Sequence, residues 1–416
     1  MSESIGYEKK KTMTTPGEPA SQDELRLPGS LLGAGIVVGV FGLLAVGLVA
    51  VRSHLGEHGQ TYAAWMGDVQ AGTVASRIQW AIGDITEPQF YKSWLASIGL
   101  LVGAAIAWRA GSRGKRWAGM PISYGSGLWP WVLGSSALSL VLSNLAFGWK
   151  LSEGWQPTFI PFVCVATSLV LIYGRGWPVL FTGAVMGAIT TTPVAMLLIT
   201  YVTGPLGLPP VVANTLAMSF GATLTFVVSR GLPWMVLPAA APHTTDPQTA
   251  TTIDGAPTRS KDAIWTIRRI IADFTETQFY ANELASIGVI LGVTLAFVLN
   301  PLVPSYGTAL LPHILFAQAL TSAIGVVVWR RLYRGGGWAP TYISVVSVAP
   351  ATVLAFNGSA LSIVVGAIAG ALLCPVIARP ISNRLPSDFH PFIGNTMSMA
   401  ISTAIVVTAV GLIPGV

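Results

Sequence analysis

Residues 83–99 read GDITEPQFYKSWLASIG, and residues 272–288 read ADFTETQFYANELASIG. Eleven of the seventeen positions are identical. Shorter matches follow downstream at a nearly constant offset: GAVMG at 183–187 matches GAIAG at 366–370, and ANTLAM at 213–218 matches GNTMSM at 394–399. Self-similarity over most of a chain indicates an internal duplication. The fold is therefore predicted to contain two copies of one unit.

The composition indicates a membrane protein. Charged residues make up only 10% of the chain, against about 25% in soluble domains. They gather in short clusters, and the stretches between them are long enough to cross about 30 Å of hydrocarbon. We expect an all-α, polytopic fold of about eleven spans, with no separate soluble domain. The two cysteines, Cys164 and Cys374, fall inside apolar stretches and are interpreted as small apolar residues.

Each copy is predicted to hold five spans. An additional, uncleaved first span covers Leu31–Val51. The expected spans of the first copy are 88–108, 126–147, 157–173, 177–203 and 210–229, and those of the second copy are 277–300, 308–329, 340–357, 359–378 and 391–413.

Loop charges predict that the copies are inverted. Arg109, Arg113, Lys115 and Arg116 follow the first span of copy one, whereas the equivalent loop of copy two carries no charge. The next loop reverses this pattern, with its basic residues in copy two. Because Lys and Arg mark cytoplasmic loops, we expect a multi-pass protein of the cell membrane with a cytoplasmic N-terminus and an extracytoplasmic C-terminus.

These expectations divide the chain into six parts. They are a cytoplasmic tail (1–29), the first span (30–51), an extracytoplasmic segment (52–86), the first repeat (87–230), a cytoplasmic linker (231–274) and the second repeat (275–416). A five-plus-five inverted architecture is similar to that of urea channels, ammonium channels and several secondary transporters. That likeness is architectural, and a fold alone does not fix a function.

The repeated motif Asp-x-Thr-Glu-x-Gln-Phe-Tyr has two interpretations. Its acids are candidates for ion ligands or a gate. We favour a structural role, because Thr followed by Gln three residues later is typical of a capping box, and the aromatic residues suit a membrane interface.

The predicted solute site lies where the two repeats meet. Both fourth spans carry a proline in mid-span, and paired broken helices at matching positions are typical of a transporter site. Both fifth spans carry an Asn-Thr pair, and an Asn inside a span is costly unless it is paired. Plain kinks and interhelical hydrogen bonds are the structural alternatives. The candidate substrate-binding residues are Thr191, Thr192, Pro193, Asn214, Thr215, Gln318, Pro375, Asn395 and Thr396.

The predicted spans contain no Asp, Glu, Lys or Arg in their interior, which argues against ion exchange through a buried carboxylate. No catalytic, phosphate-binding or metal-binding motif is found. We therefore expect a transporter or channel for a small solute, with no enzymatic activity, no cofactor, no metal and no nucleic-acid partner. Its expected partners are the bilayer and the solute, and self-association is left open. The alternative is a non-transport membrane component, either an assembly partner or a lipid-handling protein.

Overall fold

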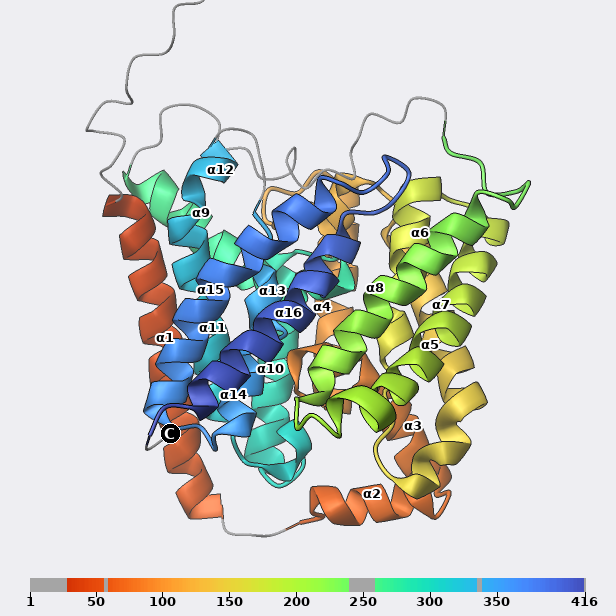
Figure 1. Ribbon diagram of the computed structural model, residues 1–416. Helices are drawn as coiled ribbons and strands as arrows, with labels where there is room; N and C mark the ends of the chain where they lie inside the picture. Colours follow the sequence, from red (N-terminus) through yellow and green to blue (C-terminus); the bar gives the residue numbers. More distant parts are fainter. Residues whose placement is uncertain (1–27, 56–58, 239–258, 335–338, 415–416) are drawn as a thin grey trace, which may run out of the picture.

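The computed structural model describes residues 28–55, 59–238, 259–334 and 339–414, and within them every regular element is a helix (Figure 1). Eight helices are long and apolar enough to cross a membrane, so the chain is a helical membrane protein. These eight are α1 (Pro28–Leu55), α4 (Trp94–Ser112), α5 (Trp129–Phe147), α7 (Trp177–Leu198), α8 (Pro210–Ser229), α11 (Leu311–Val328), α15 (Ala360–Ser382) and α16 (Phe392–Gly411).

The remaining three predicted spans are short or bent. The segment 277–300 contains α10 (Glu283–Leu299), which is bent by 79° from the helical segment Arg259–Gln278 before it. The segment 157–173 contains a short 3-10 turn and α6 (Val165–Tyr173). The segment 340–357 contains α13 (Tyr342–Val345) and α14 (Val348–Ala355).

Three further helices lie outside the predicted spans. They are α2 (Tyr62–Gln70), α3 (Val74–Gly83) and α9 (Arg259–Ala272), and a short α12 (Arg330–Arg334) follows α11. Helix α2 lies across one end of the bundle (Figure 1). Residues 1–27 of the predicted N-terminal tail and residues 239–258 of the predicted linker lie outside the described residues. From Arg259 onward, however, the linker region forms α9, which packs against α1 and α11.

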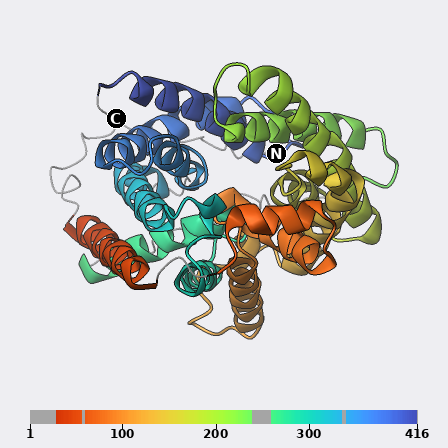
Figure 2. The ribbon, with the colours of Figure 1, turned by 90° about the horizontal axis from the view of Figure 1, so that it is seen from below.

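The two most extensive contacts between the copies each join a helix to the equivalent helix of the other copy. Helix α4 packs on α10, and α8 packs on α16; seen along the bundle, these pairs lie on opposite sides of the molecule (Figure 2). Added β-carbons at Gly99, Gly103 and Gly292 would overlap the backbone of Gly288, Leu284 and Leu95, respectively. Because the numbers rise on one helix as they fall on the other, α4 and α10 are antiparallel. The glycines allow this close approach.

The predicted breaks at Pro193 and Pro375 are wrong. Helices α7 and α15 continue through these prolines, since one proline deletes a single backbone hydrogen bond and packing on both sides keeps the helix. The breaks lie instead in the third span of each copy, at Cys164 (φ −141°, ψ −96°) and at the equivalent Ser347 (φ −142°, ψ −86°).

Candidate functional site

The repeated motif forms two buried turns at the centre of the molecule. They are the 3-10 segments Asp84–Gln89, after α3, and Asp273–Gln278, after α9. Each ends in a left-handed residue, Phe90 (φ 66°) or Phe279 (φ 63°), which reverses the chain toward α4 or α10. The interpretation of this motif as an interfacial helix cap is wrong, because both turns are buried and the helices begin only afterwards, at Trp94 and Glu283.

The two turns are joined by a reciprocal pair of amide hydrogen bonds. Gln89 Nε2 donates to Gln278 Oε1 at 2.7 Å, and Gln278 Nε2 donates to Gln89 Oε1 at 2.9 Å. Each amide also donates to a backbone carbonyl of the other turn, at Phe274 and Ile85. Both side chains are fully buried. These hydrogen bonds of Gln89 and Gln278 therefore join the two copies nearly symmetrically at the centre of the molecule, and we call them the glutamine lock.

In the first copy, two buried carboxylates share one ammonium group. Lys92 Nζ contacts Asp84 and lies 2.5 Å from Glu87 Oε2. Thr158 Oγ1 donates to Asp84 Oδ2 at 2.7 Å, and Asn144 Nδ2 donates to the same oxygen at 3.0 Å. The side chains of Asp84, Glu87 and Lys92 are almost completely inaccessible to solvent.

In the second copy, the cation comes from the other flank of the turn. Arg269 contacts both Asp273 and Glu276, while Ser322 and Thr341 donate to Asp273. The expectation of a protein without buried carboxylates is therefore wrong. These charges were missed because they lie on turns and half-helices between the apolar stretches, and the structure folds those turns into the interior.

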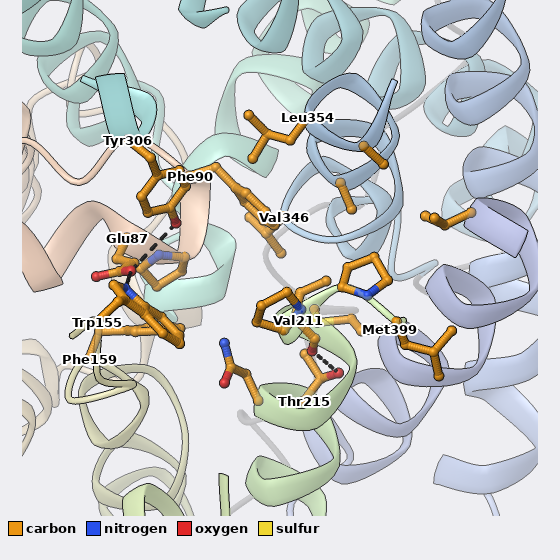
Figure 3. Close-up of a pocket in the computed structure, with 18 of the residues that line it drawn as sticks. Glu87, Phe90, Trp155, Phe159, Val211, Thr215, Tyr306, Val346, Leu354 and Met399 are labelled. Carbon is orange, nitrogen blue, oxygen red and sulfur yellow. Dashed lines mark hydrogen bonds between the residues drawn. The ribbon is translucent and has the colours of Figure 1, made fainter. Parts of the chain in front are cut away.

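A cavity of about 620 Å³ lies beside the first turn (Figure 3), and Tyr62 at the start of α2 also lines it. Its polar wall contains Glu87, whose Oε1 accepts from Trp155 Nε1 at 2.5 Å and from the Tyr306 hydroxyl at 3.5 Å. Asn214 and Thr215 line another part of it. Asn214 is 4% exposed, and its Oδ1 has no hydrogen-bond partner.

The predicted Asn-Thr pairs have different environments. Asn214 and Thr215 face the cavity, whereas Asn395 donates to the hydroxyl of Tyr342 at 3.1 Å. Thr396 bonds Ser219 at 2.8 Å across the α8–α16 contact. The two asparagines therefore do not face one another across a common path.

The other predicted site residues lie away from the cavity. Thr191 donates to the Gly187 carbonyl, and Thr192 bonds Ser143. Gln318 is central: it accepts from the Tyr91 hydroxyl at 2.7 Å and donates to the carbonyls of Gln89 and Val345. Through these hydrogen bonds Gln318 therefore stabilises the end of the first turn.

Five aromatic residues of the cavity were not predicted: Tyr62, Phe90, Trp155, Phe159 and Tyr306. Phe90 belongs to the repeated motif, and Trp155 and Phe159 belong to a second matched stretch, 155–160 with 338–343. The internal duplication therefore marked Phe90, Trp155 and Phe159 as matched positions. The aromatic type alone indicated only a membrane interface.

Near the opposite end of the bundle, several residues aligned with cavity residues of the other copy are buried. We call the residue at the aligned position of the other copy its counterpart. Phe279, Leu171, Tyr124 and Tyr342 are buried, and they are the counterparts of Phe90, Leu354, Tyr306 and Phe159 in the cavity wall.

An aromatic and ionic cluster covers this closed end. Phe226 stacks on Phe389 with ring centroids 5.2 Å apart. Arg230 donates two hydrogen bonds of 2.7 Å to Asp388, and these hold the pKa of Asp388 below its ordinary value. His390 packs against Phe279, and burial lowers its pKa to about 3, so the imidazole is neutral at physiological pH.

A scan against protein-family models gave no match to this chain, and a search of curated proteins gave none. In the part of the chain that the structure describes, no group of three or more His, Cys, Asp or Glu residues is arranged to hold a metal ion.

Proposed function

We propose that this protein is a membrane transporter for a small organic solute that works by alternating access, with its two halves formed by inverted copies of one five-helix unit. The observation that carries the proposal is the contrast between the two ends. The cavity beside Glu87 is open, while the counterpart residues around Glu276 are packed together.

The antiparallel packing of α4 on α10 supports the inversion. A residue and its own counterpart meet at Gln89 and Gln278 and again at Gly99 and Gly288. Such self-matched contacts occur at a two-fold axis. Inverted copies that differ in conformation can exchange those conformations, and this exchange closes one end while it opens the other.

The distribution of basic residues supports the orientation. At the end of the bundle opposite α2, the described chain carries many basic residues, among them Arg109, Arg113, Arg175, Arg230 and Arg379. The α2 end carries few, including Arg77 and Lys150. By the positive-inside rule the α2 end is extracytoplasmic, so the cavity faces outward, the closed cluster faces the cytoplasm, and the N-terminus is cytoplasmic.

Two helix breaks suit a moving element. Cys164 and Ser347 interrupt the third spans at equivalent positions. The second of these breaks lies beside the cavity wall at Val346. Discontinuous spans at the interface of repeats are typical of transporters, because the break lets half of a helix tilt.

The test crosslinks two residues of the aromatic and ionic cluster at the closed end, Arg230 and Asp388. Arg230→Cys and Asp388→Cys are introduced together, and the two native cysteines, Cys164 and Cys374, are buried. In proteoliposomes supplied with a panel of small solutes, a short, reducible bis-thiosulfonate linker is expected to stop flux, and reductant is expected to restore it. Each single cysteine variant is the control. Unchanged flux in the linked protein, or no flux of any solute before linking, would contradict the proposal.

A lipid-handling protein is the second candidate, because much of the cavity wall is apolar, including Val211, Met218, Leu354 and Met399. The same proteoliposomes distinguish the two functions. Movement of a fluorescent phospholipid between leaflets, together with no solute flux, is the result expected from this candidate.

A further inference from the structure

The chemistry of the cavity wall defines a ligand class. The first relevant property of the wall is its charge. Asp84 and Glu87 share the single ammonium of Lys92. None of the described residues that line the cavity is Lys, Arg or His. Two carboxylates with one cation leave an unbalanced negative charge at the inner wall, and a buried charge is costly until an opposite charge compensates it.

The second observation concerns hydrogen bonding. Asn214 lines the cavity, is 4% exposed, and its Oδ1 accepts no hydrogen bond. A buried carbonyl oxygen without a donor is costly until a donor reaches it. Its counterpart Asn395 also has an Oδ1 without a partner, but there the amide nitrogen is held by Tyr342. Glu87 and Asn214 therefore give this part of the cavity wall two oxygen acceptors, which favour a ligand that carries N–H groups.

The third observation is the aromatic wall. Trp155 and Phe159 pack with ring centroids 6.4 Å apart, and Phe90 and Tyr306 pack edge to face at 6.5 Å. All four line the same cavity as Glu87. Aromatic faces attract organic cations, more strongly where water is excluded.

We infer that the solute carried by the proposed transporter is a protonated organic amine with an apolar body, whose ammonium group lies between Glu87 and Asn214 and whose body contacts the aromatic and aliphatic wall. This inference rests on the proposed function and adds the substrate class. The cavity volume of about 620 Å³ is within the range of sites for drug-sized ligands.

The experiment compares three probes of one shape: 2-phenylethylammonium, 2-phenylethanol and 3-phenylpropionate. Binding is measured as thermal stabilisation of the full-length protein, and flux is measured in proteoliposomes. The amine is expected to bind and to be carried at least about tenfold better than the neutral and anionic probes, the effect of about one charge-assisted hydrogen bond. Equal or better transport of either other probe overturns the substrate class and leaves the transport function standing.

Variants locate the ammonium group. Glu87→Gln keeps the side-chain shape and leaves Lys92 paired with Asp84, so we expect amine affinity to fall about tenfold or more. The matched control is Glu153→Gln, which removes an exposed carboxylate near the same end of the bundle without touching the cavity. Wild-type amine affinity in a folded Glu87→Gln protein overturns the inference.

A gain-of-affinity variant covers the case in which Glu87→Gln does not fold. Asn214→Asp adds a second carboxylate of the same size at the cavity wall. We expect it to bind 2-phenylethylammonium several-fold more tightly and 3-phenylpropionate more weakly. Unchanged or weaker binding of the amine overturns the inference. If no solute moves under any condition, the proposed function fails rather than the substrate class alone.

Discussion

The two motif turns compensate the charge of their buried carboxylates in two different ways. Each buries two carboxylates with one cation. In the first copy the cation is Lys92, after the turn, and its ammonium lies 3.6 Å from the centre of the Trp80 ring. In the second copy the cation is Arg269, at the position of Trp80, and Ala281 stands at the position of Lys92. The carboxylates and the compensating charge are common to both copies, while the sequence position of the cation differs.

This difference teaches that the turn is constrained by charge balance more than by residue identity. A lysine and an arginine reach the same pair of acids from opposite flanks. In the proposed mechanism the two turns also differ in their surroundings: Glu87 of the Lys92 turn lines the open cavity, whereas Glu276 of the Arg269 turn does not.

The largest expected effect comes from removing the cation of one turn. Lys92→Met leaves two buried carboxylates without their partner, and the loss of one member of a buried pair costs about 3–5 kcal/mol. Adding Trp80→Arg imports the arrangement of the second copy and should recover much of the loss. The midpoint of thermal aggregation, followed by size-exclusion fluorescence, measures both. A double variant no more stable than Lys92→Met would show that the flanks are not interchangeable.

A slightly smaller effect is expected at the α4–α10 crossing. Gly99→Ala and Gly288→Ala each place a β-carbon against the carbonyl of the other glycine, and overpacking of this kind costs up to about 3 kcal/mol. Because the contact is symmetric, the two variants should lower thermal stability equally. Gly35→Ala, which meets no neighbouring atom, is the control. Clearly unequal effects would mean that the copies do not share this crossing equally.

The glutamine lock should show coupling. Gln89→Leu or Gln278→Leu leaves the partner amide with unmade hydrogen bonds, a cost of about 1–3 kcal/mol. The double variant removes both amides, so its loss should be less than the sum of the single losses. A double-mutant cycle on thermal stability tests this. Additive losses would indicate that the two amides act independently.

The smallest effect concerns access at the two ends. Leu354→Cys should react quickly with a polar maleimide in detergent, and Leu171→Cys, its counterpart, should react slowly.

The Arg230 hydrogen bonds lower the pKa of Asp388, so Asp388 stays ionised from pH 8 down to about pH 4 and the contact is lost only in stronger acid. Slow labelling of Leu171→Cys should persist between pH 8 and pH 5, and Asp388→Asn should speed it several-fold.

These labelling rates are read relative to Ser152→Cys, an exposed position, so that the pH dependence of the thiol itself cancels. Fast labelling at both ends in the unmodified protein would remove the contrast on which alternating access depends.

Membrane class and the duplication follow from the sequence, because apolar length and self-similarity are properties of the chain itself. The burial of the two turns does not follow from the sequence, because a short polar motif of this kind is compatible both with a membrane interface and with a protein interior. Pro193 and Pro375 were misleading for a related reason: a proline weakens a helix locally, and packing decides whether it breaks. The true breaks at Cys164 and Ser347 have no composition signal of their own.

Of the predicted site residues, Asn214 and Thr215 line the cavity, and they were singled out because an amide inside an apolar stretch is costly unless it is paired. Glu87 was quoted in the motif and assigned to a helix cap. Its role in the cavity depends on Trp155 and Tyr306, which are distant in sequence and meet it only in three dimensions.

The contacts of Gln89 with Gln278 and of Gly99 with Gly288 have an evolutionary consequence. Each joins a residue to its own aligned partner, and such contacts are also what a homodimer makes. If the two copies are inverted, as proposed, an ancestral chain of half the length that inserted in both orientations would have paired with itself through the same amide and the same glycine. Gene fusion would then have freed each half to diverge, and the placement of the cation on opposite flanks of the two turns is one such difference.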